Sequence, residues 1–271
     1  SMIVFTKTDL GGGVVSKFRF SNPIKYTKFS NLTSTSPGAA NADEHFFNGK
    51  YENCIFENCT SNYPYMFYGS DLVKCNIYNN TASWAGLWFE YGWTEQPATR
   101  FINTNICNNL ANRSFLIYYN AHAPQSLFSS NIFGNEDNFS TKYNITMYRD
   151  SPIIVKFGAP SYLGSTDDEL IREGIFDMYH KTNPMGYAMV DLSDRLIVPP
   201  AEAHGIVWKV IVNGCDAQDE FERLPPLGVG KQKFEVYFNR PMDVSKIPML
   251  TMGVRPPYTQ NTIAEEGYWS E

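Results

Sequence analysis

The side chains best suited to catalysis are two carboxylates and a histidine near the middle of the chain. Glu90 and Glu95 flank a tryptophan-rich segment, and Asp71 precedes them. Two carboxylates held about 5–9 Å apart can cleave a glycosidic bond, one as the acid and the other as base or nucleophile. His122, in a loop after two tyrosines, has the chemistry of a general acid. We favour the simpler interpretation, in which these are solvated turn charges and an incidental histidine.

A larger group of side chains is aromatic and suits binding better than bond cleavage. Three of the five tryptophans lie within residues 84–93. The flat C–H faces of sugar rings pack on aromatic faces, while sugar hydroxyls bond to nearby polar side chains. The same rings could instead fill the protein interior. The candidate glycan-binding residues are Trp84, Trp88, Tyr91, Trp93, Tyr118 and Tyr119, with Tyr63, Tyr65 and Tyr68 earlier in the chain.

Other chemistries have little support in the sequence. It contains no Gly-x-Ser-x-Gly, His-Glu-x-x-His, phosphate-loop or dinucleotide-binding pattern. A lyase would use a base such as Lys74, Arg100 or Arg113, but no acids have the spacing of calcium ligands. We therefore expect no metal and no cofactor. The net charge of −6 argues against nucleic acid as a partner, and no apolar run is long enough to insert into a membrane.

The candidate residues belong to a region of repeated sequence blocks. The blocks follow at irregular intervals of 27, 21, 29 and 26 residues, and their central apolar residues are Phe29, Phe56, Ile77, Ile106 and Ile132. Each block alternates apolar or small residues with polar ones, which predicts a short strand with one buried face. The Asn or Gly that follows suits a tight corner. Because no helical period occurs in residues 15–150, the blocks predict an all-β solenoid of about five to six coils.

Stacking of the blocks predicts which side chains lie inside the solenoid. The five central residues would form one internal ladder, and Cys54 would sit over Cys75, with Thr104 and Ser130 above them. Aromatic strands lie between the blocks, and since alternate strand residues face opposite sides, several rings must point outward. Five cysteines are an odd number, so we expect buried free thiols rather than a full disulfide framework.

Residues 15–160 resemble the right-handed parallel β-helix repeats of secreted bacterial proteins. That resemblance implies a right-handed parallel β-helix, a fold that supports both polysaccharide-degrading enzymes and adhesins. The segment that begins Tyr162-Leu163-Gly164-Ser165 is similar to the end of such helices, although Leu163 replaces the usual tryptophan. We expect a capping helix from Ser165 or Thr166 to about Tyr179, and then a short strand at 190–192.

The last part of the chain has a different β pattern. Strands are expected at 206–212, 234–238 and 248–254. Residues 230–243 resemble the Ig-like domains of bacterial surface-layer and large cell-surface proteins. Such a sandwich needs roughly 100 residues, so we expect a partial domain that leans on the β-helix. The expected domains are 1–160 (β-helix), 161–200 (helix-containing cap and linker) and 201–271 (partial Ig-like domain).

Three functional classes follow. Ser1-Met2 has the look of a cloning remnant, and we expect a segment of a longer bacterial protein that is secreted or displayed at the cell surface. The favoured class is a non-catalytic module that binds a polysaccharide or cell-surface glycan, or adheres, through an aromatic face, beside neighbouring domains. The alternative is a glycoside hydrolase or polysaccharide lyase that uses Glu90, Glu95 and His122. The third is a structural spacer.

Overall fold

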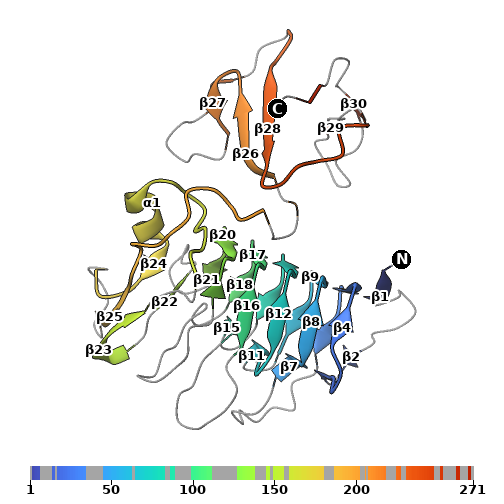
Figure 1. Ribbon diagram of the computed structural model, residues 1–271, viewed down its shortest axis with the longest axis vertical. Helices are drawn as coiled ribbons and strands as arrows, with labels where there is room; N and C mark the ends of the chain where they lie inside the picture. Colours follow the sequence, from blue (N-terminus) through green and yellow to red (C-terminus); the bar gives the residue numbers. More distant parts are fainter. Residues whose placement is uncertain are drawn as a thin grey trace. The chain divides into compact units, whose positions relative to one another are not determined.

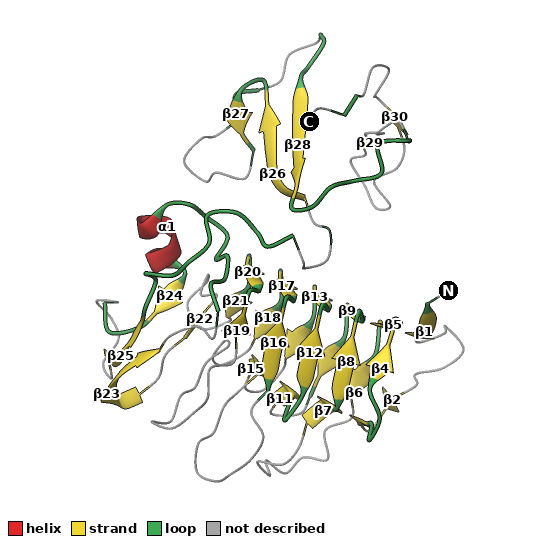
Figure 2. Cartoon of the chain, in the orientation of Figure 1, coloured by secondary structure: helices red, strands yellow, loops and turns green. Residues whose placement is uncertain are grey.

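The computed structural model is mostly β-structure, with one short helix in the described parts (Figure 2). The described residues are 2–6, 14–15, 17–34, 45–62, 65–82, 86–88, 99–111, 127–137, 145–146, 149–155, 159–179, 186–201, 205, 207–217, 224–226, 230–246, 251–252, 261–262 and 268–269. By their contacts the residues form two compact units, 1–239 and 240–271. None of the described helical residues belongs to a segment with the length and hydropathy that crossing a bilayer requires.

A six-stranded parallel sheet, here called sheet A, carries the predicted ladder. Its strands, in order, are β1 (Ile3–Thr6), β5 (Thr27–Ser30), β9 (Ile55–Glu57), β13 (Asn76–Tyr78), β17 (Asn105–Cys107) and β20 (Asn131–Phe133). The register pairs the central residues in one line: Phe5, Phe29, Phe56, Ile77, Ile106 and Ile132. The five-residue ladder predicted from the sequence is therefore confirmed, and Phe5 is a further rung that the block alignment missed.

Three more parallel sheets run beside sheet A in the described residues (Figure 1). Sheet B contains β2 (Val14–Val15), β6 (Thr33–Ser34), β10 (Thr60–Ser61), β14 (Thr81–Ala82), β18 (Leu110–Ala111) and β21 (Glu136–Asp137). Sheet C contains β3 (Phe18–Arg19), β7 (His45–Asn48), β11 (Tyr65–Phe67) and β15 (Gly86–Trp88). Sheet D contains β4 (Ile24–Lys25), β8 (Lys50–Glu52), β12 (Asp71–Val73), β16 (Arg100–Ile102) and β19 (Leu127–Phe128).

The chain visits these sheets in a fixed order, which defines one coil. After β3, β4, β5 and β6, the strands β7, β8, β9 and β10 again belong to sheets C, D, A and B, and the next two coils repeat this order. Every strand therefore pairs with its equivalent in the next coil rather than with its neighbour in sequence. This is a solenoid of stacked, in-register parallel sheets, arranged as in a parallel β-helix.

The interior of the first coils is filled by stacked phenylalanine rings. Phe29 stacks on Phe5 with ring centroids 5.3 Å apart and on Phe56 at 5.0 Å, with interplanar angles of 8° and 6°. A second stack joins Phe47 and Phe67 at 5.5 Å, and the two stacks meet edge to face. In-register parallel strands place equivalent rings one above another, so the spacing between strands sets the spacing between rings.

Each coil turns at two positions where the backbone is left-handed. Between sheets D and A these are Tyr26, Asn53, Lys74, Asn103 and Ser129, with φ from 46° to 53°. Between sheets A and B they are Asn31, Asn58, Asn79, Asn108 and Gly134, with φ from 52° to 62°. Asparagine tolerates this conformation better than other residues with a side chain. The predicted use of Asn or Gly at the corner after each block is thus confirmed.

The segment after the solenoid differs from its prediction in detail. Helix α1 (Asp168–Glu173) has Asp167 as its N-cap, not Ser165 or Thr166, and it ends at Gly174 rather than near Tyr179. Two further parallel pairs explain the early end. β24 (Ile175–Phe176) pairs with β22 (Ile145–Thr146), and β25 (Gly186–Val190) pairs with β23 (Arg149–Val155). Burial of Ile175 in a strand, at 2% exposure, replaces the helical turn that its spacing suggested.

The last part of the first unit holds an antiparallel sheet. β26 (Val207–Val212) pairs with β27 (Cys215–Asp216) and with β28 (Phe234–Phe238), which confirms two predicted strands. In the second unit β29 (Thr251–Met252) pairs with β30 (Asn261–Thr262). The rest of the strand expected at 248–254 lies outside the described residues.

Candidate functional site

Most residues proposed from the sequence as a site lie outside the described parts of the chain. This holds for the carboxylates and the histidine, Glu90, Glu95 and His122. It also holds for five of the six candidate aromatics, Trp84, Tyr91, Trp93, Tyr118 and Tyr119. For Trp88 the backbone is described, as the last residue of β15. The interpretation of these residues therefore stays a prediction.

The register of sheet C bears on Trp88. Trp88 pairs with Phe67, which pairs with Phe47 in the coil before. Both phenylalanines are completely buried. Phe46 and Met66, which alternate with them along the strands, are also 0% exposed, so both faces of this sheet are covered at these coils. Register partners share a face of the sheet, so a substitution at Trp88 has to be tested for its effect on folding as well as on binding.

The described strand ends show where the aromatic segments leave the column. Ala82 and Ala111 are register partners at the ends of β14 and β18 in sheet B. The stretch that contains Trp84 follows Ala82 directly, and the stretch with Tyr118 and Tyr119 follows Ala111. The distance in sequence from a sheet B strand to the next described strand also varies: β11 begins four residues after Ser61, whereas β19 begins sixteen residues after Ala111. In solenoids, insertions of variable length at one corner often form the binding face.

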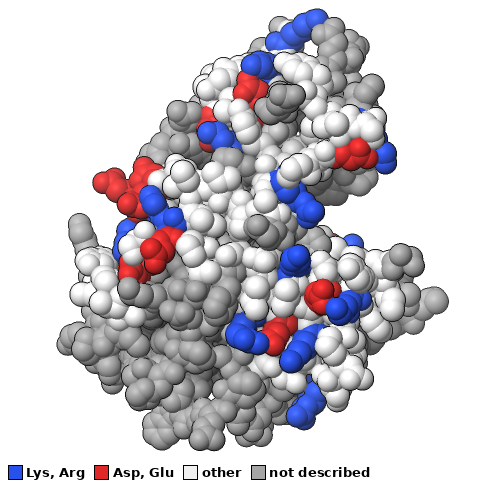
Figure 3. Space-filling model, in the orientation of Figure 1, with Lys and Arg blue, Asp and Glu red and all other residues white. Residues whose placement is uncertain are grey.

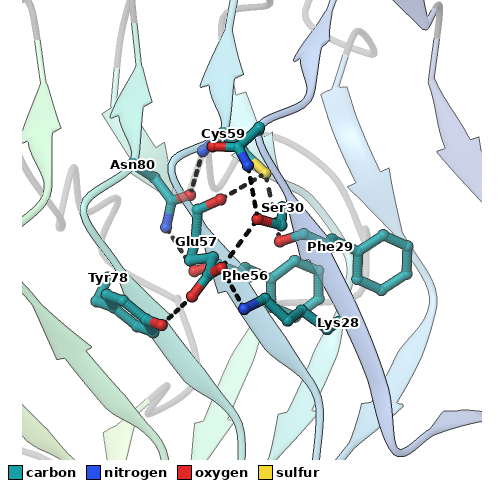
Figure 4. A network of polar contacts seen from close by, with 9 residues as sticks. Lys28, Phe29, Ser30, Phe56, Glu57, Cys59, Tyr78 and Asn80 are labelled. Carbon is teal, nitrogen blue, oxygen red and sulfur yellow. Dashed lines mark hydrogen bonds and ion pairs between the residues drawn. The ribbon is translucent and has the colours of Figure 1, made fainter. Parts of the chain in front are cut away.

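A polar cluster on the outer face of sheet A is the best-defined group of ionisable side chains (Figure 4). Its centre is Glu57, only 8% exposed although it alternates with the inward-facing Phe56. One carboxylate oxygen accepts a hydrogen bond of 2.9 Å from the Ser30 hydroxyl and forms an ion pair with Lys28. The other accepts a hydrogen bond from the Tyr78 hydroxyl. Strands β5, β9 and β13 thus each contribute to one contact network.

The electrostatics of this cluster favour an ionised carboxylate. Burial by itself would raise the pKa of Glu57, but the hydrogen bonds from Lys28, Tyr78 and Ser30 and the charge of Lys28 hold it below its ordinary value. Burial, together with the hydrogen bond to Glu57 and its charge, raises the pKa of Tyr78. Glu57 is therefore charged at neutral pH with both oxygens engaged. A carboxylate in this state is a poor proton donor and a blocked nucleophile, which suits a positioning role better than catalysis.

Toward β20 the outer face of sheet A carries a row of asparagine amides and the ring of Phe133. Asn76, Asn105 and Asn131 are register partners, and Asn131 donates a hydrogen bond of 2.6 Å to Asn105 Oδ1. Among the described residues, Oδ1 of Asn76 and Oδ1 of Asn131 are buried and have no hydrogen-bond partner. Buried carbonyl oxygens normally accept a hydrogen bond from protein or from ordered water. Each of these two amide oxygens can therefore accept a hydrogen bond from a donor such as a water or a ligand hydroxyl.

The outer face of sheet D carries charges of both signs (Figure 3). Asp71 accepts two hydrogen bonds from Arg100, at 2.7 and 2.8 Å, in a bidentate pair between register partners. Lys25 pairs with Glu52, and Lys50 is the register partner of Asp71 on its other side. These pairs are largely exposed, and such surface pairs contribute little to stability.

Neither outer face assembles a recognised catalytic group in the parts of the chain that the structure describes. Those parts contain no group of three or more His, Cys, Asp and Glu side chains placed to hold a metal ion. The Glu57 cluster contains one carboxylate, whereas glycoside hydrolysis uses two. What the described faces offer is a set of hydroxyl, amide and ionic groups at regular spacing along the coils.

The sequence also carries a signal for the outer face of sheet A, in the two residues that flank each central apolar residue. In every block the residues before and after the central apolar residue point away from it, because strand residues alternate. Reading those two positions down the blocks yields Lys28, Ile55, Asn76, Asn105 and Asn131 in one row, and Ser30, Glu57, Tyr78, Cys107 and Phe133 in the other.

Comparison with known proteins does not assign a function to these faces. No protein-family model, no curated protein and no solved structure matches this chain. The fold is shown by its own hydrogen-bonded register, and any function has to be argued from its own residues.

Proposed function

We propose that this chain is a non-catalytic, glycan-binding or adhesive module of a larger secreted or cell-surface bacterial protein. The binding face would consist of the aromatic residues that follow the strands of sheets B and C in successive coils. Its partners would be a polysaccharide or a cell-surface glycan, together with neighbouring domains of the longer chain.

One observation carries this proposal. The segments with Trp84 and with Tyr118 and Tyr119 begin after Ala82 and Ala111, which are register partners in sheet B. The aromatic segments therefore start from the same edge of the column, one coil apart. Equivalent strands of adjacent coils are about 4.8 Å apart, a distance comparable to the size of one sugar ring, so rings from consecutive coils would suit a chain of sugars better than a single one.

Several finer features belong to the same proposal. The coils would be right-handed, and α1 with its flanking strands would cap the end of the solenoid. Leu163 and Ile171 support the cap, since both belong to the buried core cluster. The strands β26, β27 and β28 would be part of an Ig-like domain similar to those of bacterial surface-layer proteins. The module would work outside the cell.

Measurement of glycan binding by variants that lack individual aromatic rings, or pairs of them, tests the proposal. The purified chain would be passed over immobilised plant and bacterial polysaccharides, and a retained glycan would be titrated by calorimetry. A Trp93→Ala/Tyr118→Ala double variant should bind at least about tenfold more weakly, because losing a stacked aromatic typically costs 1 kcal/mol or more. Trp88→Ala should be measured separately, with its thermal midpoint, because of its buried register partners.

The controls distinguish the remaining functional classes. Tyr237→Ala removes an exposed aromatic of β28 and should leave binding unchanged. Retention of full affinity in the double variant would rule out these rings as the platform. Release of reducing ends from a bound polysaccharide, lost in Glu90→Gln or Glu95→Gln, would establish the enzyme alternative. Absence of binding to every glycan offered would favour a structural spacer.

A further inference from the structure

The inner corner between sheets D and A is lined by one small hydrogen-bonding side chain from each coil. These are Thr27, Cys54, Cys75, Thr104, Ser130 and Ser161. Each donates to a backbone carbonyl two residues earlier, to a carbonyl of the preceding coil, or to both. Two of the six positions, in consecutive coils, hold cysteine.

Cys54 and Cys75 occupy equivalent positions in consecutive coils. The strands that follow them pair in register at Ile55 and Asn76, and the Asn76 N–H donates to the Cys54 carbonyl at 2.9 Å. Their thiols donate to backbone carbonyls of the same corner, Cys54 to those of Ile24 and Glu52 and Cys75 to those of Tyr51 and Val73. Both side chains are 0% exposed and both are free thiols. The two side chains therefore occupy equivalent positions of one buried corner, one coil apart.

We propose that Cys54 and Cys75 form a redox modification site, in which oxidation joins two successive coils through a disulfide. Equivalent residues of adjacent parallel strands lie about 4.8 Å apart, within the range of about 4.4–6.8 Å between Cα atoms that disulfides use. The other three thiols have no such neighbour. The register partners of Cys107 are Tyr78 and Phe133. Cys59 stands beside Asn80, and Cys215 lies in β27.

The oxidation balances with a low-molecular-weight disulfide as the oxidant. Because both thiols are buried in the folded chain, the exchange begins while the corner is open, during folding: the Cys54 thiolate attacks one sulfur of the oxidant, which releases one thiol and leaves a mixed disulfide. Cys75 then gives up its proton, attacks the Cys54 sulfur and displaces the second thiol. Two protein S–H groups are oxidised, and one external disulfide is reduced to two thiols.

The position of the bond determines its effect. Residues 54 and 75 span one full coil, so the disulfide closes one turn of the solenoid into a covalent ring. Such a ring removes conformational freedom from the unfolded chain. Oxidising conditions of this kind occur outside the cell, where the module is proposed to work, but the chemistry itself does not depend on glycan binding.

Mass spectrometry of the full chain tests the site. A Cys215→Ser background removes the one cysteine that is not buried. The reduced protein would be incubated with reduced and oxidised glutathione, both in the folded state and during refolding from urea. We expect a loss of 2 Da, a cross-linked peptide that contains Cys54 and Cys75, and a thermal midpoint about 5–10 °C higher than that of the reduced form.

Serine variants supply the matched controls. Cys75→Ser should fold normally, because Ser130 and Ser161 occupy equivalent positions of the same corner, and it should show neither the cross-link nor the rise in midpoint. Cys59→Ser should still form the cross-link. Absence of the 54–75 peptide after refolding in oxidised glutathione, or a stable glutathione adduct on Cys54, would overturn the proposal.

Discussion

The two inner corners of the solenoid use different side chains to form hydrogen bonds with buried backbone groups. The corner between sheets D and A uses thiols and hydroxyls, as at Cys75 and Thr104. The corner between sheets A and B uses asparagine amides at Asn80, Asn109 and Asn135. Both must satisfy backbone groups that the turn removes from the sheets, because unpaired buried N–H and C=O groups are costly.

The difference lies in how many groups one side chain can satisfy. The hydroxyl of Thr104 accepts from the Cys75 N–H at 3.2 Å and has one proton for the carbonyls of Leu72 and Ile102. The amide of Asn109 does more. Its Oδ1 accepts from the backbone and side-chain nitrogens of Asn80, both at 3.0 Å. Its Nδ2 donates to the carbonyls of Ile77 and Cys107 and to Asn135 Oδ1, all at 3.0 Å. An amide therefore couples three coils, whereas a hydroxyl couples adjacent coils through the backbone alone.

The largest effect should come from the middle of the amide corner. Asn109→Ala would leave the buried Asn80 N–H without its acceptor and would remove the side-chain donor to the Ile77 carbonyl. We expect the free energy of unfolding to fall by about 3–5 kcal/mol, because several buried groups lose their partners at once. Urea denaturation followed by circular dichroism measures this. A loss below about 1 kcal/mol would contradict the proposed coupling of three coils.

The same kind of change in the other corner should cost less. Thr104→Val keeps the shape of the side chain but removes the hydroxyl, so the Cys75 N–H and the Leu72 carbonyl lose one bond each. We expect a loss of about 1–2 kcal/mol by the same urea measurement. Thr104→Ser, which retains the hydroxyl, is the matched control and should lose less. Equal losses for Thr104→Val and Asn109→Ala would remove the distinction between the corners.

A pH titration should separate both corners from the outer face. The contacts of Glu57 lower its folded-state pKa, so its ionised form stabilises the protein above the unfolded value of about 4.3. This contribution is lost as the pH falls through the folded-state pKa. Glu57→Gln should therefore destabilise the protein at pH 7 and by less at pH 3.

The corner variants provide the contrast for that titration, together with a surface control. The losses caused by Asn109→Ala and Thr104→Val should change little between pH 7 and pH 3, because amides and hydroxyls do not titrate in this range. Glu173→Gln, at an exposed position of α1, should have no measurable effect at either pH. A constant deficit of Glu57→Gln at both pH values would show that packing rather than charge accounts for it.

The smallest effect should come from extending the amide corner by one coil. Cys59 occupies the position before Asn80, and its thiol donates to the carbonyls of Phe29 and Glu57. An amide in Cys59→Asn would meet the Phe29 and Glu57 carbonyls, which are equivalent to the Ile77 and Cys107 carbonyls that Asn109 contacts. We expect a gain of up to about 1 kcal/mol in the thermal and urea transitions. Cys59→Ala is the control and should lose stability, and a Cys59→Asn variant less stable than Cys59→Ala would show that the corner cannot hold a further amide.

The contrast between the corners also shows how far the sequence could be interpreted. The block alignment predicts the stacking of Cys54, Cys75, Thr104 and Ser130, and the strand register and the hydrogen bonds from Cys75 N to Thr104 and from Thr104 N to Ser130 confirm it. The asparagines of the other corner were understood only as residues that suit a turn. Two asparagines follow each other in two blocks, at Asn79-Asn80 and Asn108-Asn109. One takes the left-handed backbone conformation and its neighbour points inward as the ladder amide, which sequence spacing alone does not distinguish.

The other differences have similar causes. The early end of α1 depends on β22, some thirty residues earlier, which pairs with Ile175 and Phe176. The burial of Glu57 depends on Lys28, Ser30 and Tyr78 in adjacent coils. Both are contacts between residues distant in the chain, so no local pattern reports them. The aromatic binding face remains a prediction, because five of its six residues lie outside the described parts of the chain and only the backbone of Trp88 is described.

The sequence by itself determined the repeat, the in-register ladder from Phe29 to Ile132 and the class of fold. It could do so because a parallel strand has a period of two residues and every coil must bury an equivalent side chain at the same place. Only the tertiary structure decided which polar side chains meet. Contacts such as Glu57 with Tyr78, or Cys54 with Cys75, depend on the register between coils and on the direction of each side chain at a corner, and these follow from packing across the whole column rather than from any one block.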